Sequence, residues 1–198
     1  MPDYSIEKEI SLKGYKYICG VDEAGRGPLA GPVCAAAVIL KPDTQIEGLN
    51  DSKKLSEKKR EALFDVICEK ATAYSVAFAT VPEIEQFNIL NATYLAMNRA
   101  IEGLRCKADF AIIDGNRVPT DCPVEVKTVV KGDSLSMSVA AASVLAKVSR
   151  DRLMLTLDEE YPQYNFKKHK GYGTKEHIEL IRKYGISPVH RPSFLKKI

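Results

Sequence analysis

Three short apolar segments of the chain lead directly into acidic residues. Asp22 and Glu23 follow YICGV, Asp114 follows FAII, and Asp133 follows VEVKTVVKG. The segments resemble β-strands, in which acidic side chains are disfavoured, and carboxylates that are buried together require a compensating charge. The pattern therefore predicts a sheet that collects carboxylates at the ends of its strands.

The remaining apolar patterns predict helices and strands in the order of an α/β fold. Strand patterns cover residues 17–21, 33–40, 74–80, 108–113 and 124–130, and helical patterns cover 5–12, 56–70, 82–102, 134–157 and 174–184. The first three strands would form an antiparallel meander and the later ones alternate with helices, which indicates a mixed sheet flanked by helices. The helix at 134–157 begins with many Ala and Ser residues, so we expect it to pack closely against the sheet.

Length and composition limit the class of protein. The 198 residues fit a single domain, with residues 1–14 as an N-terminal extension and about 160–198 as a basic, helical C-terminal segment. The longest apolar stretch, 29–40, is far shorter than the roughly 20 residues that span a bilayer. The chain begins without a hydrophobic signal core, and its five cysteines form no C-x-x-C pair. We therefore expect a cytoplasmic protein with reduced thiols.

The charge of the chain is unevenly distributed. The net charge is +3, but residues 164–198 contain nine Lys or Arg and only two Glu. A basic segment beside an acidic body is typical of a protein that binds a polyanion at one place and cations at another. We expect Lys167, Lys168 and Lys170 to contact the polyanion, although a charged run is also typical of a solvated surface.

The acidic residues suggest a cation site. Carboxylates are hard ligands, and a site without nearby Cys or His selects Mg²⁺ or Mn²⁺ over Zn²⁺. The alternative is that each acidic residue simply marks the end of a strand.

Two glycine-rich segments are candidates for substrate contact. Gly25, Arg26 and Gly27 would let the backbone approach a sugar or phosphate, unless they form an ordinary tight turn. No Gly-Lys-Ser/Thr sequence follows, so a nucleotide-triphosphate loop is excluded. Tyr172 lies between two glycines and near several cations, which favours stacking on a sugar or base over a place in the core.

The chain resembles the bacterial ribonuclease HII family, the type 2 ribonucleases H. The resemblance rests on six blocks that occur in order between Tyr17 and Phe194: GVDEAGRGPLAGPV, LNDSKKLSEKKR, AIIDGNR, VVKGD with SVAAASVLAKVSRDR, YPQY with HKGYGTKEH, and HRPSF. It implies a ribonuclease-H-like fold with a mixed five-stranded sheet. It also implies an endonuclease that cuts the RNA strand of RNA–DNA hybrids and single ribonucleotides embedded in duplex DNA.

The resemblance also assigns residues. It implies that Asp22, Glu23, Asp114 and Asp133 are the catalytic, metal-binding carboxylates, that Gly25, Arg26 and Gly27 form the substrate loop, and that Tyr172 senses the RNA–DNA junction. Two divalent ions, Mg²⁺ or Mn²⁺, would then support hydrolysis to 3′-hydroxyl and 5′-phosphate ends. Further candidates for phosphate contacts are Asn50, Ser52, Lys53, Lys147 and Arg150.

Other interpretations remain open at this point. A ribonuclease HIII-like nuclease would have overlapping substrates but usually carries an additional N-terminal domain, and only about sixteen residues precede the first predicted strand here. A non-catalytic nucleic-acid-binding module would gain nothing from four acidic residues near a polyanion, and a resolvase would not need the glycine loop together with Tyr172. We expect a monomer. The segment from Arg191 to Leu195 either packs on the domain or contacts a partner such as a sliding clamp.

Overall fold

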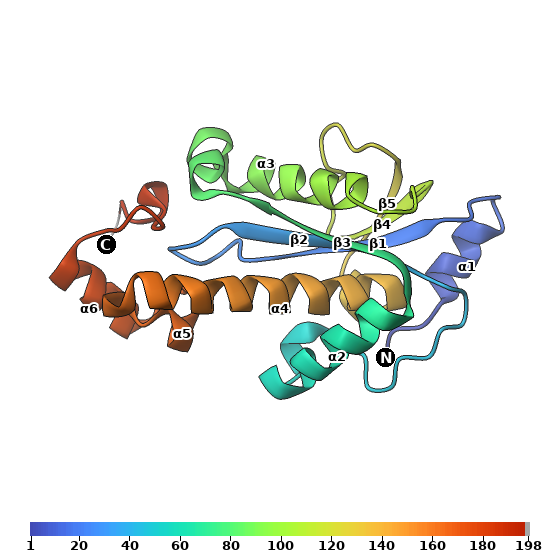
Figure 1. Ribbon diagram of the computed structural model, residues 1–198. Helices are drawn as coiled ribbons and strands as arrows, with labels where there is room; N and C mark the ends of the chain where they lie inside the picture. The colour runs from blue at the N-terminus through green and yellow to red at the C-terminus, as the bar shows by residue number, and fades with distance from the viewer. Residues whose placement is uncertain (197–198) are drawn as a thin grey trace.

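The computed structural model describes residues 1–196 as three layers, with a five-stranded sheet between two layers of helices (Figure 1). The strands are β1 (Ile18–Ala24), β2 (Val33–Leu40), β3 (Ala71–Ala79), β4 (Phe110–Asp114) and β5 (Glu125–Val129). Their order in the sheet is β3-β2-β1-β4-β5. The pairs β1–β2 and β2–β3 are antiparallel, whereas β1–β4 and β4–β5 are parallel. This arrangement confirms the predicted meander and mixed sheet.

The helices cover both faces of the sheet. They are α1 (Ser5–Ser11), α2 (Glu57–Lys70), α3 (Val81–Glu102), α4 (Met137–Glu160), α5 (Phe166–His169) and α6 (Lys175–Tyr184). One apolar core lies between the sheet and α3, and a second lies between the opposite face and α2 with α4 (Figure 1). Within the described residues, no helix is both long and apolar enough to cross a membrane.

Helix α4 approaches the central strand closely, as its small residues predict. A Cβ atom added at Gly20 in β1 would lie 2.1 Å from the carbonyl carbon of Ser138 in α4. Only a glycine at this position leaves room for the helix backbone. The contact places the start of α4 beside the strand that carries Asp22.

Strand β1 is longer than predicted. It continues through Asp22 and Glu23 because these residues pair with Ala36 and Ala35 of β2 after the pairing with β4 has ended at Val21. The two acidic residues therefore lie inside the strand and not after it. Helix α5 was not predicted, because a four-residue helix leaves no periodic pattern in the sequence.

Candidate active site

Three acidic side chains from separate elements meet at one edge of the sheet. Asp22 lies in β1, Asp114 ends β4, and Asp133 lies in the 3₁₀-helix Gly132–Ser134 that follows β5. Each contributes a carboxylate oxygen, and these oxygens lie within 4.8 Å of one another. Parallel pairing of Val21 with Ile113 brings the next residues, Asp22 and Asp114, to the same level of the sheet. The structure thus brings together three of the four predicted carboxylates.

Backbone hydrogen bonds orient these carboxylates. The Glu23 amide donates to Asp22 Oδ1 at 2.7 Å, and the Gly132 amide donates to Asp114 Oδ1 at 2.7 Å. The second bond joins the end of β4 to the turn that carries Asp133. The relative positions of the three acidic groups therefore depend on the turn at 131–136.

Burial and neighbouring carboxylates raise the pKa values of Asp22 and Asp133. Asp22 and Asp133 are each only 4% exposed. Burial, followed by the charges of Glu23 and Asp114, raises the pKa of Asp22 well above its usual value. Burial and then Asp114 raise the pKa of Asp133. A group of hard oxygen ligands that repel one another in a buried place fits a divalent cation.

Lys53 is a cation beside this group. Its Nζ lies 3.7 Å from Asp133 Oδ2. Partial burial alone would lower the pKa of Lys53, but the charges of Asp22 and Asp133 raise it. The lysine offsets part of the negative charge of the three acidic groups.

Glu23 is not among the carboxylates whose oxygens lie within 4.8 Å of one another. Successive side chains of a strand point to opposite sides, so Glu23 leaves β1 on the side opposite to Asp22. Glu23 Oε1 accepts a bond from Arg26 Nη1 at 3.2 Å, whereas Oε2 is buried with no hydrogen-bond partner among the described residues. Burial raises the pKa of Glu23, although Arg26 opposes this effect. Glu23 lines the same cavity as Asp22 but lies outside the group of three, so its role as a metal ligand stays a prediction.

A cavity of about 220 Å³ adjoins the carboxylates. Its lining includes Asp22, Glu23, Gly25, Arg26, Gly27, Ser52, Lys53, Lys147 and Tyr172. Seven of the nine residues predicted for substrate contact thus lie around one cavity, although they come from four separate parts of the sequence. Asn50 is absent from the described residues that line it, and its Oδ1 accepts the Asp51 amide instead.

Arg150 was predicted to contact phosphate, and this prediction is wrong. Its side chain is 1% exposed and donates to the carbonyl oxygens of Pro32, Lys170 and Ala30 at 3.0–3.1 Å. A Cβ atom at Gly25 would lie 2.0 Å from Arg150 Nε. The guanidinium supports the substrate loop from inside the protein.

Arg191 has a similar role that sequence reasoning missed. It is fully buried and donates to the carbonyl oxygens of Gly31, Arg26 and Gly25 at 2.9, 3.0 and 2.7 Å. Burial, together with the charge of Arg150, lowers the pKa of Arg191 to about 9. The only signal in the sequence was the HRPSF block, which does not indicate a contact across 166 positions. Arg191 and Phe194 thus pack on the domain, whereas Pro192 and Ser193 between them are exposed.

Tyr172 lies at the rim of the cavity and is 43% exposed. Its ring lies near Gly27, and Lys147 Nζ is 5.8 Å from the ring centroid. The Gly171 amide donates to His169 Nδ1 at 3.2 Å, directly before the tyrosine. The exposed ring is available for a ligand in the cavity.

A chain of histidines holds the backbone of Tyr172. The Ser187 amide donates to His190 Nδ1, which leaves the proton of neutral His190 on Nε2. That nitrogen donates to His177 Nε2 at 3.1 Å, and His177 Nδ1 donates to the Tyr172 carbonyl at 2.9 Å. Burial lowers the pKa of both histidines to about 4, so both are neutral at physiological pH.

The basic C-terminal segment is less positive than its composition implies. Lys167, Lys168 and Lys170 lie 3.8, 2.6 and 3.9 Å from carboxylate oxygens of Asp158, Glu176 and Glu57. Their charge is partly neutralised, which weakens the expectation that they form the main contact with a polyanion.

The comparisons with known proteins agree with this geometry. A sequence model of the family described as Ribonuclease HII matches residues 19–197. Ribonuclease HII of Clostridioides difficile (strain 630) is 58% identical over 192 residues, which cover 97% of this chain and 75% of that protein.

Two solved structures have the same fold. Ribonuclease H2 from Pyrococcus horikoshii OT3 is similar with a TM-score of 0.74 and 28% identity, covering 90% of this chain and 93% of that one. Ribonuclease HII in the PCNA complex from Archaeoglobus fulgidus has a TM-score of 0.73 and 24% identity, covering 89% and 94%. The chain therefore belongs to the ribonuclease HII family, whose members are metal-dependent endonucleases that act on the RNA of RNA–DNA hybrids.

Proposed function

We propose that this protein hydrolyses the RNA strand of RNA–DNA hybrids and also cuts at single ribonucleotides embedded in duplex DNA. The observation that carries the proposal is one cavity lined by Asp22 of the acidic cluster, by the glycine loop and by the exposed Tyr172. The acidic cluster supplies the hydrolytic site, and the other two features supply selection for a ribose beside a deoxyribose.

Asp22, Glu23, Asp114 and Asp133 would hold two divalent cations, Mg²⁺ or Mn²⁺. Their oxygen donors fit these ions, and the unpartnered Glu23 Oε2 leaves one buried acceptor free for a ligand. When bound, the ions lower the pKa of the attacking water and stabilise the leaving 3′-oxygen. The products are a 3′-hydroxyl and a 5′-phosphate.

The residues of the chain itself position the substrate. The backbone of Gly25–Gly27 recognises the ribose 2′-hydroxyl, which distinguishes RNA from DNA at that sugar. All three histidines are buried in the C-terminal segment, so the site offers no imidazole pair for attack by the 2′-hydroxyl. Water is therefore the nucleophile in this proposal.

Other residues of the cavity contact the strand on either side. Tyr172 stacks on the next sugar and favours a deoxyribose there, because a 2′-hydroxyl would crowd the ring. Lys53 and Lys147 contact phosphates. Ser52 also lines the cavity, and its hydroxyl oxygen accepts a 2.7 Å bond from Ser143 Oγ.

We further propose that the protein acts as a monomeric single domain in the cytoplasm. Its five cysteines are free thiols, which suits a reducing compartment. The Archaeoglobus fulgidus relative was solved in complex with PCNA, which supports a sliding clamp as a candidate partner. Arg191 itself is buried against the glycine loop, so a clamp contact would not use its side chain.

The test is cleavage of a duplex that contains one ribonucleotide, with and without Mg²⁺ or Mn²⁺. We expect a single cut that requires the metal and leaves a 3′-hydroxyl end. An all-DNA duplex of the same sequence is the control. Cleavage that continues in excess chelator, or a 2′,3′-cyclic phosphate end, would contradict the proposed mechanism.

A further inference from the structure

The first eleven residues precede the part of the chain that matches the family model, which begins at residue 19. They nevertheless contact the turn that carries Asp133. The Asp3 amide donates to the Leu135 carbonyl at 3.1 Å, and the Met137 amide donates to the Asp3 carbonyl at 3.1 Å. These bonds make Asp3 and Ser136 a parallel β-bridge, four residues before the carboxylate of Glu7.

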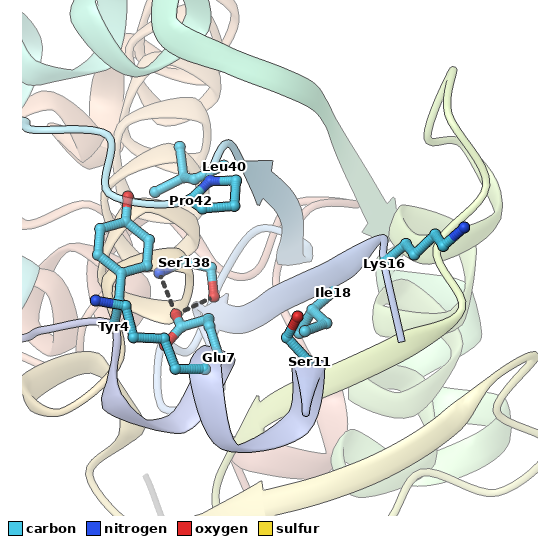
Figure 2. Close-up of a pocket in the computed structure, with 9 residues that line it drawn as sticks. Tyr4, Glu7, Ser11, Lys16, Ile18, Leu40, Pro42 and Ser138 are labelled. Atoms are coloured by element: carbon cyan, nitrogen blue, oxygen red, sulfur yellow. Dashed lines mark hydrogen bonds between the residues drawn. The ribbon is translucent and has the colours of Figure 1, made fainter. Parts of the chain in front are cut away.

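Glu7 extends from α1 to the first turn of α4 (Figure 2). Its Oε1 accepts bonds from Ser136 Oγ at 2.6 Å, Ser138 Oγ at 2.7 Å and the Ser138 amide at 3.0 Å. Ser136 is the N-cap of α4 and also accepts the Val139 amide. A carboxylate at a helix N-terminus is stabilised by the free amide groups and by the helix dipole. Glu7 thus joins α1 to the start of α4.

A short path of hydrogen bonds leads from Glu7 to the acidic cluster. The Ser136 amide donates to the Gly132 carbonyl at 2.8 Å, and the Gly132 amide donates to Asp114 Oδ1 at 2.7 Å. Asp133 lies between these bonded residues. A shift of Ser136 therefore moves the peptide that carries Asp133 and the donor that orients Asp114.

Apolar packing does not replace these bonds near Glu7. A cavity of about 90 Å³ lies beside the carboxylate and is lined in part by Tyr4, Leu40 and Pro42 (Figure 2). The main apolar anchor of α1 is Ile10, on the next turn of the helix. Without the Glu7 carboxylate, the polar contacts of the N-terminal segment with residues 135–138 would be the backbone bonds of Asp3, beside the apolar cluster that contains Tyr4 and Met137.

We propose that Glu7 is a positioning residue, which fixes the turn at 131–136 so that Asp133 and Asp114 are aligned to bind metal. The proposal rests on the proposed function of the acidic cluster. It makes the N-terminal helix part of the catalytic apparatus, although the helix contributes no group to the cavity.

The test compares Glu7→Ala and Glu7→Gln with Glu9→Ala. Glu9 is an exposed residue of the same helix that pairs with Lys127 at 2.7 Å, so it controls for loss of a carboxylate from α1. Mn²⁺ affinity is measured by calorimetry without substrate, and kcat and KM are measured on the single-ribonucleotide duplex well below the melting temperature. Circular dichroism establishes that each variant is folded.

We expect Glu7→Ala to weaken Mn²⁺ binding several-fold and to lower kcat by about tenfold to a hundredfold with little change in KM, because small misplacements of catalytic groups have effects of this size. Glu7→Gln retains an acceptor oxygen and should lose less. Glu9→Ala should behave as the wild type. If Glu7→Ala does not fold, Glu7→Gln decides by the same measurements.

The proposal is overturned if the folded Glu7 variants keep the Mn²⁺ affinity and kcat of the wild type. That result would leave the proposed function intact. A wild-type protein that neither binds Mn²⁺ nor cuts the duplex would instead refute the proposed function itself.

Discussion

Replacing Asp22 with Asn should stabilise the metal-free protein while abolishing cleavage. Asp22 is buried beside two carboxylates whose oxygens lie within 4.8 Å. At that distance, and at an effective dielectric constant of about 20, each pair of charges repels by about 3.5 kcal/mol. Asp22→Asn removes the repulsion with both neighbours and removes a buried charge.

The measurable gain is smaller than the sum of these repulsions. The pKa of Asp22 is raised well above its usual value, so the native protein relieves part of the repulsion by binding a proton. Each unit of pKa difference between the native and unfolded states corresponds to about 1.4 kcal/mol. We expect a net gain of about 1–3 kcal/mol, or on the order of 5 °C in melting temperature for a chain of this size.

The assay is thermal unfolding in chelator and in excess Mg²⁺ or Mn²⁺. In chelator, Asp22→Asn should melt above the wild type. Metal at a hundred times its dissociation constant should stabilise the wild type by about 2.7 kcal/mol, whereas the variant should respond weakly. In excess metal, the difference in melting temperature between the two proteins should therefore shrink or change sign. Asp65→Asn, a change on the exposed surface of α2, is the control and should alter neither value.

The pH dependence gives a second check on the same variant. A carboxylate whose native pKa is raised destabilises the fold above its unfolded pKa, and this effect disappears as the pH falls to about 3.8. The advantage of Asp22→Asn in chelator should therefore shrink from pH 8 to pH 5. An Asn variant that is no more stable than the wild type in chelator, or that cuts at the wild-type rate, would refute the reasoning.

Three further predictions concern residues around the cavity. Arg150→Met should remove the donor to three buried or partly buried carbonyl oxygens and lower the free energy of unfolding by about 3 kcal/mol, measured by urea denaturation. A loss of substrate affinity without a loss of stability would instead restore the phosphate-contact interpretation. His177 has a native pKa of about 4, whereas an unfolded histidine binds a proton near pH 6.5, so the wild type should lose stability as the pH falls from 6.5 to 4. His177→Gln should reduce the slope of the free energy of unfolding against pH by up to about 1.4 kcal/mol per pH unit. An unchanged slope would contradict a buried, neutral His177. Tyr172→Ala should lower the cleavage rate on a single embedded ribonucleotide by about tenfold to a hundredfold and the rate on a long hybrid by less. Tyr172→Phe should lower both rates less than Tyr172→Ala does. Equal losses on the two substrates would show that the ring does not recognise the RNA–DNA junction.

Local pattern was sufficient to predict much of the fold. Short apolar segments located all five strands, and the Ala- and Ser-rich segment located the helix that packs on Gly20. These features depend on neighbours within one strand or one helical turn, so the sequence contains the relevant information directly. The same holds for Asp114, which ends its strand as its place in the sequence predicts.

The site was predicted in its residue types but not in its full geometry. The apolar pattern ends before Asp22, yet pairing with β2 continues the strand and leaves Glu23 outside the group of three carboxylates. The resemblance to a known family named the glycine loop and Tyr172, but it gave no indication of the groups that hold them. Position in a motif specifies which residue is present, whereas the direction of its side chain depends on the strand that pairs with it.

Tertiary structure alone decided which charged residues face the substrate and which support the fold. Arg150 has the charge and the basic sequence neighbours that are typical of a phosphate-binding residue. In the structure it is buried and donates to carbonyl oxygens 20 to 120 positions away. Arg191 reaches Gly25 across 166 positions, and Glu7 reaches Ser138 across 131. The sequence determined the strands, the order of the helices and the carboxylates. Contacts over such separations form only when the helices pack on the sheet. Whether a charged side chain can be buried depends on the hydrogen-bond partners that this packing supplies, and no local pattern in the sequence contains them.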